Sequence, residues 1–76
     1  MRSKFERLAL RESSAPDGSR WWLVQYAVDG RPCLPFYEPE ARRREAGWDD
    51  EQWFRHLEEQ AITSLESFGA APAMSR

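Results

Sequence analysis

The 76-residue sequence contains one cysteine and one histidine, and this scarcity excludes much catalytic and metal chemistry. With Cys33 as the single thiol, the chain cannot form an internal disulfide or a cysteine-based zinc cluster. A Cys33–His56 pair is formally available to a nucleophilic enzyme. However, we expect Cys33 to face the core from a strand and His56 to lie on the polar face of a helix. A thiol without a nearby base or a lowered pKa is a poor nucleophile, so no catalytic residue is predicted.

Long apolar runs and closely spaced glycines are also missing. The N-terminus has no apolar segment of signal-peptide length, and no segment approaches the roughly 20 apolar residues of a membrane span. The four glycines, at 18, 30, 47 and 69, stand too far apart to cradle a phosphate. The acidic run at 49–51 lacks the spacing of a calcium loop. We therefore expect a cytoplasmic protein that is not an enzyme, with no cofactor, no metal site and no membrane association.

Net charge is only −2, but the charges are unevenly distributed along the chain. Residues 1–44 carry nine Lys or Arg against six Asp or Glu, whereas residues 45–76 carry two against seven. The first part is thus mildly basic and the second acidic. Of the eleven basic residues, Lys4 is the single lysine, a bias that fits a GC-rich coding sequence and suggests a bacterial or phage source.

The chain is instead rich in aromatic residues, which make up 13% of it and can build a core in so small a domain. Residues 4–12 show short apolar stretches flanked by charge and predict an edge strand. Residues 13–19 are turn formers. Residues 20–28 alternate strongly and predict a strand that is apolar on both faces, with Trp22 on one face and Trp21 on the other.

Asp29-Gly30 predicts a type I′ hairpin that leads into a third strand. This turn places Tyr26 opposite Cys33, and it continues to the pairs 23/36 and 22/37. Pro35 has no N–H with which to bond the central strand, so regular pairing should stop or bulge there, and the third strand should lie at an edge.

Two helical segments follow. Residues 39–46 predict a short helical turn with ion pairs at 38/42 and 40/44. Residues 47–69 predict a long helix in which Asp49 and Gln52 form a capping box, and in which Trp48 packs on Trp53. Its apolar stripe comprises residues 53, 54, 57, 61, 65 and 68, with 62 at the margin. Gly69 ends it.

The resulting prediction is an α+β fold: a three-stranded antiparallel β-meander with one C-terminal amphipathic helix packed on one face (β-β-β-α). A single domain spans residues 1–69, and residues 70–76 form a flexible tail. One helix covers only one face of such a sheet, so the second face needs another cover. The 39–46 segment, the tail or a second copy of the protein are the candidates.

The best functional candidates are the large side chains on that second face. We expect Trp21, Leu23, Leu34 and Phe36 to meet a partner there, with Arg42, Arg43 and Arg44 at the rim. Trp and Arg are enriched at interface hot spots, and exposed apolar surface usually marks a contact site. The function predicted is a small non-enzymatic protein-interaction module, of the adaptor, inhibitor or immunity type, that occludes a protein partner or forms a homodimer.

Nucleic-acid binding is the alternative interpretation. The run Arg42–Arg44 and the strand aromatics resemble the basic, stacking surfaces that hold single strands. The acidic balance of the whole chain and the neighbouring glutamates argue against it.

Overall fold

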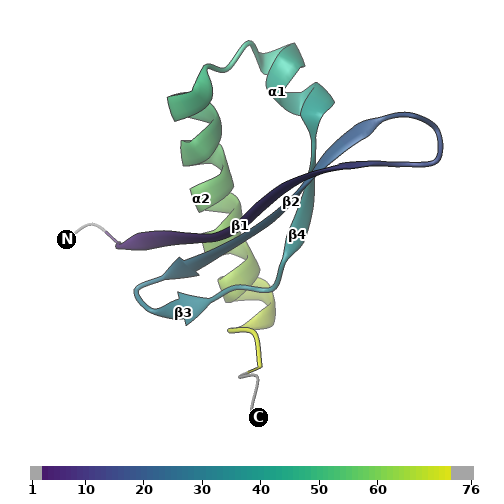
Figure 1. Cartoon of the computed structure of the whole chain (residues 1–76). Coiled ribbons are helices and arrows are strands. Elements are labelled where there is room, and N and C mark those ends of the chain that lie inside the picture. Colours follow the sequence, from purple (N-terminus) through teal and green to yellow (C-terminus); the bar gives the residue numbers. More distant parts are fainter. Residues whose placement is uncertain (1–2, 73–76) are drawn as a thin grey trace.

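The computed structural model describes residues 3–72 and shows the expected α+β architecture (Figure 1). The elements, in chain order, are β1 (Phe5–Ser14), β2 (Arg20–Val28), β3 (Arg31–Pro32), β4 (Phe36–Pro39), α1 (Glu40–Ala46) and α2 (Asp50–Phe68). β2 is the central strand, with β1 antiparallel on one side and both β3 and β4 antiparallel on the other. The meander and the C-terminal helix are therefore confirmed.

The tail predicted at 70–76 lies mostly outside the described residues. Within them, the Ala71 N–H donates to the Pro32 carbonyl at 2.8 Å, so the chain returns to β3 after α2 ends. Neither helix of residues 3–72 is long and apolar enough to cross a membrane.

The β2–β3 hairpin has the predicted turn. Asp29 and Gly30 both adopt positive φ, at 53° and 82°, as a type I′ turn requires. The Cys33 N–H donates to the Tyr26 carbonyl at 2.9 Å, which confirms that these two residues form a hydrogen-bonded pair. Cys33 itself is fully buried in the core.

Beyond the hairpin the register changes at Pro35, where pairing was expected to stop or bulge. β3 ends at Pro32, and β4 resumes pairing at Phe36 with one extra residue inserted. Leu23 consequently faces Tyr37 and not Phe36, while Trp22 faces Glu38 and not Tyr37, so the two predicted pairs are each wrong by one residue. Because strand side chains alternate with a period of two, this slip exchanges the two faces of β4.

β1 contains a second irregularity. Its register against β2 shifts between Arg7 and Ala9, which leaves Leu8 as an extra residue in a β-bulge. Phe5 and Arg7 before the bulge therefore share a face with Leu10 after it. This explains why the strand shows no single alternation in sequence.

Local sequence signals define both ends of α2. The Asp49 side chain accepts from the Gln52 N–H at 2.8 Å, and the Gln52 side chain accepts from the Asp49 N–H at 3.1 Å. The capping box is thus confirmed. α1 begins after Pro39 and ends at Gly47, whose φ of 70° suits a glycine after a helix. Trp48 packs against the core, but its ring partner is His56, at 4.7 Å between centroids, while Trp53 pairs with Trp22 at 5.3 Å.

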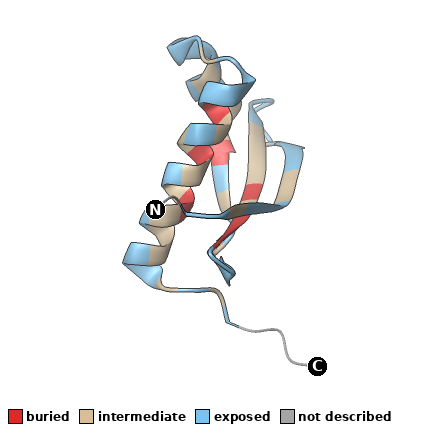
Figure 2. Cartoon of the chain, turned by 90° about the vertical axis from the view of Figure 1, so that its left-hand side faces the viewer, coloured by how far each residue is buried: buried red, intermediate tan, exposed pale blue. Residues whose placement is uncertain are grey.

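The core lies between α2 and one face of the sheet, as the buried positions in Figure 2 show. Its fully buried members from α2 are Trp53, Leu57 and Ala61, which occupy the N-terminal two thirds of the helix. Phe68 was expected in the same stripe but is 73% exposed. It lies in the last turn, beyond the helix segment that packs on the sheet.

Candidate protein-binding surface

The face of the sheet opposite α2 is the strongest candidate site. In residues 3–72 no helix lies over it, and α2 covers the other face (Figure 2). We call it the open face. Register assigns to it the following side chains: Trp21, Leu23, Gln25 and Ala27 of β2, Tyr37 and Pro39 of β4, and Ala9, Arg11 and Ser13 of β1. Tyr37 is 62% exposed, and a large ring in that position is a plausible contact for a partner.

Hydrogen bonds from the preceding loop hold Trp21 in place. Its indole Nε1 donates to the Ser19 hydroxyl at 2.9 Å, and that hydroxyl donates to Asp17 Oδ1 at 2.6 Å. The Ser19 N–H also donates to the same carboxylate oxygen at 2.9 Å. These bonds, the side-chain one most strongly, lower the pKa of Asp17. Trp21 is thus a half-buried ring whose orientation is fixed by the 17–19 loop.

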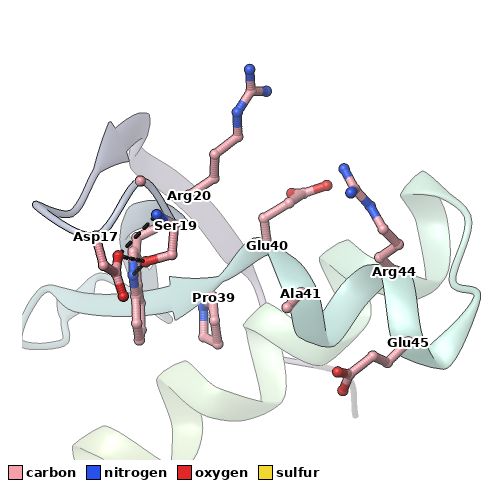
Figure 3. Close-up of a pocket in the computed structure, with 10 residues that line it drawn as sticks. Asp17, Ser19, Arg20, Pro39, Glu40, Ala41, Arg44 and Glu45 are labelled. Carbon is pink, nitrogen blue, oxygen red and sulfur yellow. Dashed lines mark hydrogen bonds between the residues drawn. The ribbon is translucent and has the colours of Figure 1, made fainter.

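Three depressions meet at Trp21. The largest, about 1090 Å³, lies between the 17–20 loop and α1 (Figure 3). A smaller apolar slot of about 330 Å³ separates Trp21 and Tyr37 from residues 13–15. The third is a groove of about 450 Å³ that runs between β4 and the C-terminal half of α2, where Leu34 and Phe68 line it.

Of the four predicted apolar contact residues, two lie on the open face and two line the groove. Trp21 and Leu23 lie on the open face, and both are half-buried. Leu34 is half-buried and lines the groove. Phe36 lies on the opposite face, where it packs against the core, because of the slip at Pro35. Tyr37 occupies the position on the open face that Phe36 was predicted to occupy.

Sequence reasoning missed Tyr37 and Phe68. For Tyr37 the relevant signal was Pro35, which indicated a break in the strand pairing. It did not determine at which residue the pairing would resume. For Phe68 there was no signal, because its position in the helical stripe predicts burial.

The three consecutive arginines are separated by the structure. Arg42 lies with its Nε 3.8 Å from Glu38 Oε2, the ion pair predicted from sequence, and it lines the groove. Arg43 turns inward, pairs with Asp50 and lies over the Trp53 ring at 4.7 Å. Arg44 lines the large depression. They therefore do not form one continuous basic rim.

Glu40 was expected to pair with Arg44. Instead its carboxylate accepts from the Trp22 indole Nε1 at 2.6 Å. This bond ties the first turn of α1 to β2 and satisfies a polar group beside the core.

A buried ion pair is the main feature that the sequence did not reveal. Glu38 is only 3% exposed, and its Oε2 lies 3.1 Å from His56 Nε2. His56 is itself largely buried between Glu38 and the Trp48 ring, so the prediction of a solvated histidine was wrong. Charged groups are rarely buried unless paired, and this pair joins β4 to α2.

Cys33 and His56, the two side chains considered for nucleophilic chemistry, are each engaged elsewhere in the fold. Cys33 is sealed in the core, and His56 is engaged by Glu38. No three His, Cys, Asp or Glu side chains of these residues are grouped closely enough to hold a metal ion.

Comparison with known proteins gives no relative. No protein-family model, no curated protein and no solved structure matches this chain. The function must therefore be inferred from the surface itself.

Proposed function

We propose that this chain is a non-enzymatic protein-interaction module that binds another protein through the open face of its sheet. The observation that carries the proposal is the pair Trp21 and Tyr37, two large rings on a sheet face that residues 3–72 leave uncovered. Trp and Tyr are among the residues most enriched at the centres of interfaces. Trp21 is also pre-organised, which lowers the entropy lost on binding.

The edges of the sheet favour a contact through its face. β1 is interrupted by the bulge at Leu8 and carries alternating charges, both of which discourage edge-to-edge pairing. β4 has four residues, ends in Pro39 and is preceded by Pro35. Neither edge offers a long, regular row of backbone groups to an added strand. A partner is therefore better accommodated on the side chains of the open face.

The groove extends this surface around the edge of β4. Leu34 and Phe68 line it, and the polar residues Thr63 and Ser67 of α2 border it. An apolar centre with a polar rim is the usual anatomy of a protein interface. We propose the open face and the groove together as the binding surface.

Nucleic acid fits the arginines less well than a protein does. Arg43 is engaged by Asp50 and Trp53, and Arg42 is paired with Glu38. Of the three consecutive arginines, only Arg44 has no carboxylate within ion-pair distance among the described residues. One free guanidinium in this run supplies little of the phosphate neutralisation on which nucleic-acid affinity depends.

We propose a cytoplasmic location and a bacterial or phage source, as expected from the sequence. Cys33, a buried free thiol, is compatible with a reducing compartment.

The experiment compares capture of partners by three proteins: the unaltered chain, Trp21→Ala and Leu8→Ala. Leu8 is 44% exposed at the β1 bulge and does not belong to the proposed surface, so its variant controls for general loss of apolar area. We expect a protein that is captured by the unaltered chain and by Leu8→Ala but not by Trp21→Ala. Its purified form should then bind with about 10- to 100-fold lower affinity to Trp21→Ala, because hot-spot truncation costs roughly 2 kcal/mol or more.

Sedimentation equilibrium decides whether the partner is a second copy. A homodimer that Trp21→Ala dissociates would support the same surface with a different occupant. A strict monomer whose captured proteins are the same with and without the Trp21 ring would contradict the proposal.

A further inference from the structure

The charges around Trp21 indicate which kind of protein segment fits it. The large depression beside Trp21 is lined by three carboxylates and two guanidinium groups, and Figure 3 shows how they divide. Asp17 and Glu45 point to the same side as Pro39 (Figure 3). Arg20, Glu40 and Arg44 point to the other side (Figure 3).

The first of these two sides is the open face. Pro39 pairs directly with Trp21 across β2 and β4, so their side chains share a face. Trp21 shares the lining of this depression with Asp17 of the loop and with Glu45 of α1. Asp17 is held by the bonds from Ser19 that also position the indole. Glu45 has no cationic partner within ion-pair distance among residues 3–72.

Two of the nearby cations are paired with carboxylates elsewhere, and Arg44 points to the other side of the depression (Figure 3). Arg20 pairs with Glu12 at 2.9 Å, and Arg42 is paired with Glu38. Arg11 lies on the open face opposite Leu23 but does not line the depression. On the side of the open face, the lining of the depression therefore holds two carboxylates, Asp17 and Glu45, and no basic side chain.

We propose that the partner protein presents an arginine or lysine side chain that lies against the Trp21 indole, in the depression that Asp17 and Glu45 also line. This inference rests on the proposed function and names the chemistry of the partner. A cation is attracted to the face of an indole, and a planar guanidinium can stack on it while bonding carboxylates. Phosphate groups would be repelled by the same two carboxylates. The acidic net charge of the chain assists the approach of a basic partner.

The test selects binders from a phage-displayed library of random peptides, with Trp21→Ala as the counter-selection. Enriched peptides should contain Arg or Lys, and replacing that residue by Gln should weaken binding about tenfold. Glu45→Gln should weaken binding about three- to tenfold, the range expected of a cation contact near the surface. Glu66→Gln on α2 makes the same change in net charge away from the depression and should change affinity less than about twofold.

The possible results separate the two proposals. Peptides that require Trp21 but lack a basic residue, or that ignore Glu45→Gln, would overturn the arginine or lysine inference while supporting the binding surface. Absence of any peptide that depends on Trp21 would count against both. Should Trp21→Ala fail to give the native circular dichroism spectrum, Tyr37→Ala serves as the counter-selection, since Tyr37 is more exposed.

Discussion

Replacing Tyr26 by Phe should make the protein more stable. Tyr26 is 2% exposed, its ring packs edge-on against Phe5, and its hydroxyl makes no hydrogen bond of normal geometry, although the Arg7 side chain lies close enough to interact with it. A buried polar group without a partner costs about 1–3 kcal/mol. The charge of Arg7 near the ring offsets part of this cost, so we expect a gain of about 1 kcal/mol. For a domain of this size that raises Tm by about 4–8 °C.

The same substitution should remove a loss of stability at alkaline pH. Burial raises the pKa of Tyr26 above its ordinary value of 10.0, with the charge of Arg7 opposing part of the rise. Below about pH 10 the hydroxyl is protonated in both folded and unfolded chains, so its contribution is constant. Above that pH the unfolded chain loses the proton first, and stability falls as pH rises by up to about 1.4 kcal/mol per unit. Tyr26→Phe lacks this hydroxyl, so its stability should fall less as the pH rises above about 10.

Urea unfolding followed by tryptophan fluorescence at pH 7, 9 and 11 measures both effects. The gain in the free energy of unfolding from Tyr26→Phe should be equal at pH 7 and pH 9 and larger at pH 11. Tyr37→Phe is the matched control, because Tyr37 is mostly exposed and its ring is retained. A Tyr26→Phe protein that is less stable at pH 7 would show that the hydroxyl is bonded, and the reasoning from its burial would be refuted.

Two further changes test the elements that hold the fold together. Asp49→Ala removes the carboxylate that accepts from the Gln52 N–H in the α2 capping box and should cost about 1 kcal/mol in urea unfolding, while Asp50→Asn at the next position should cost less. His56→Ala leaves the buried Glu38 carboxylate with only Arg42 nearby and should cost about 2–4 kcal/mol, whereas the double variant Glu38→Leu/His56→Leu should recover most of that loss. A double variant as unstable as His56→Ala alone would show that packing of the imidazole, and not the unpaired charge, is what matters.

Features determined by neighbouring residues could be predicted from the sequence. The Asp29-Gly30 turn, the capping box at Asp49 and the helix end at Gly69 each depend on a few adjacent side chains, and all three are present. The placement of Trp21 on a second sheet face, opposite to that of Trp22, also followed from alternation along one strand. In each case the relevant interaction lies within one element or one turn.

Features determined by contacts between distant segments could not be predicted. His56 lies on the side of α2 that its apolar stripe marks as polar, and only the position of β4 brings Glu38 against it. Phe68 continues the stripe, but the sheet does not extend far enough to cover it. Helical periodicity states which residues share a face and not how much of that face another element covers.

The register slip at Pro35 links these unpredicted features. The missing N–H of Pro35 was compatible with a break in strand pairing and with a continued register. Which of the two occurred determined whether Phe36 or Tyr37 entered the core. With the slip, Phe36 packs against the core and the Tyr37 hydroxyl stays in water, which avoids burying a polar group. The slip also turns Glu38 inward, a cost that His56 and Arg42 offset. The exposed Tyr37 ring on the open face is therefore coupled to the Glu38–His56 pair on the other face. A variant that weakens this pair should disturb partner binding without altering any residue of the binding surface.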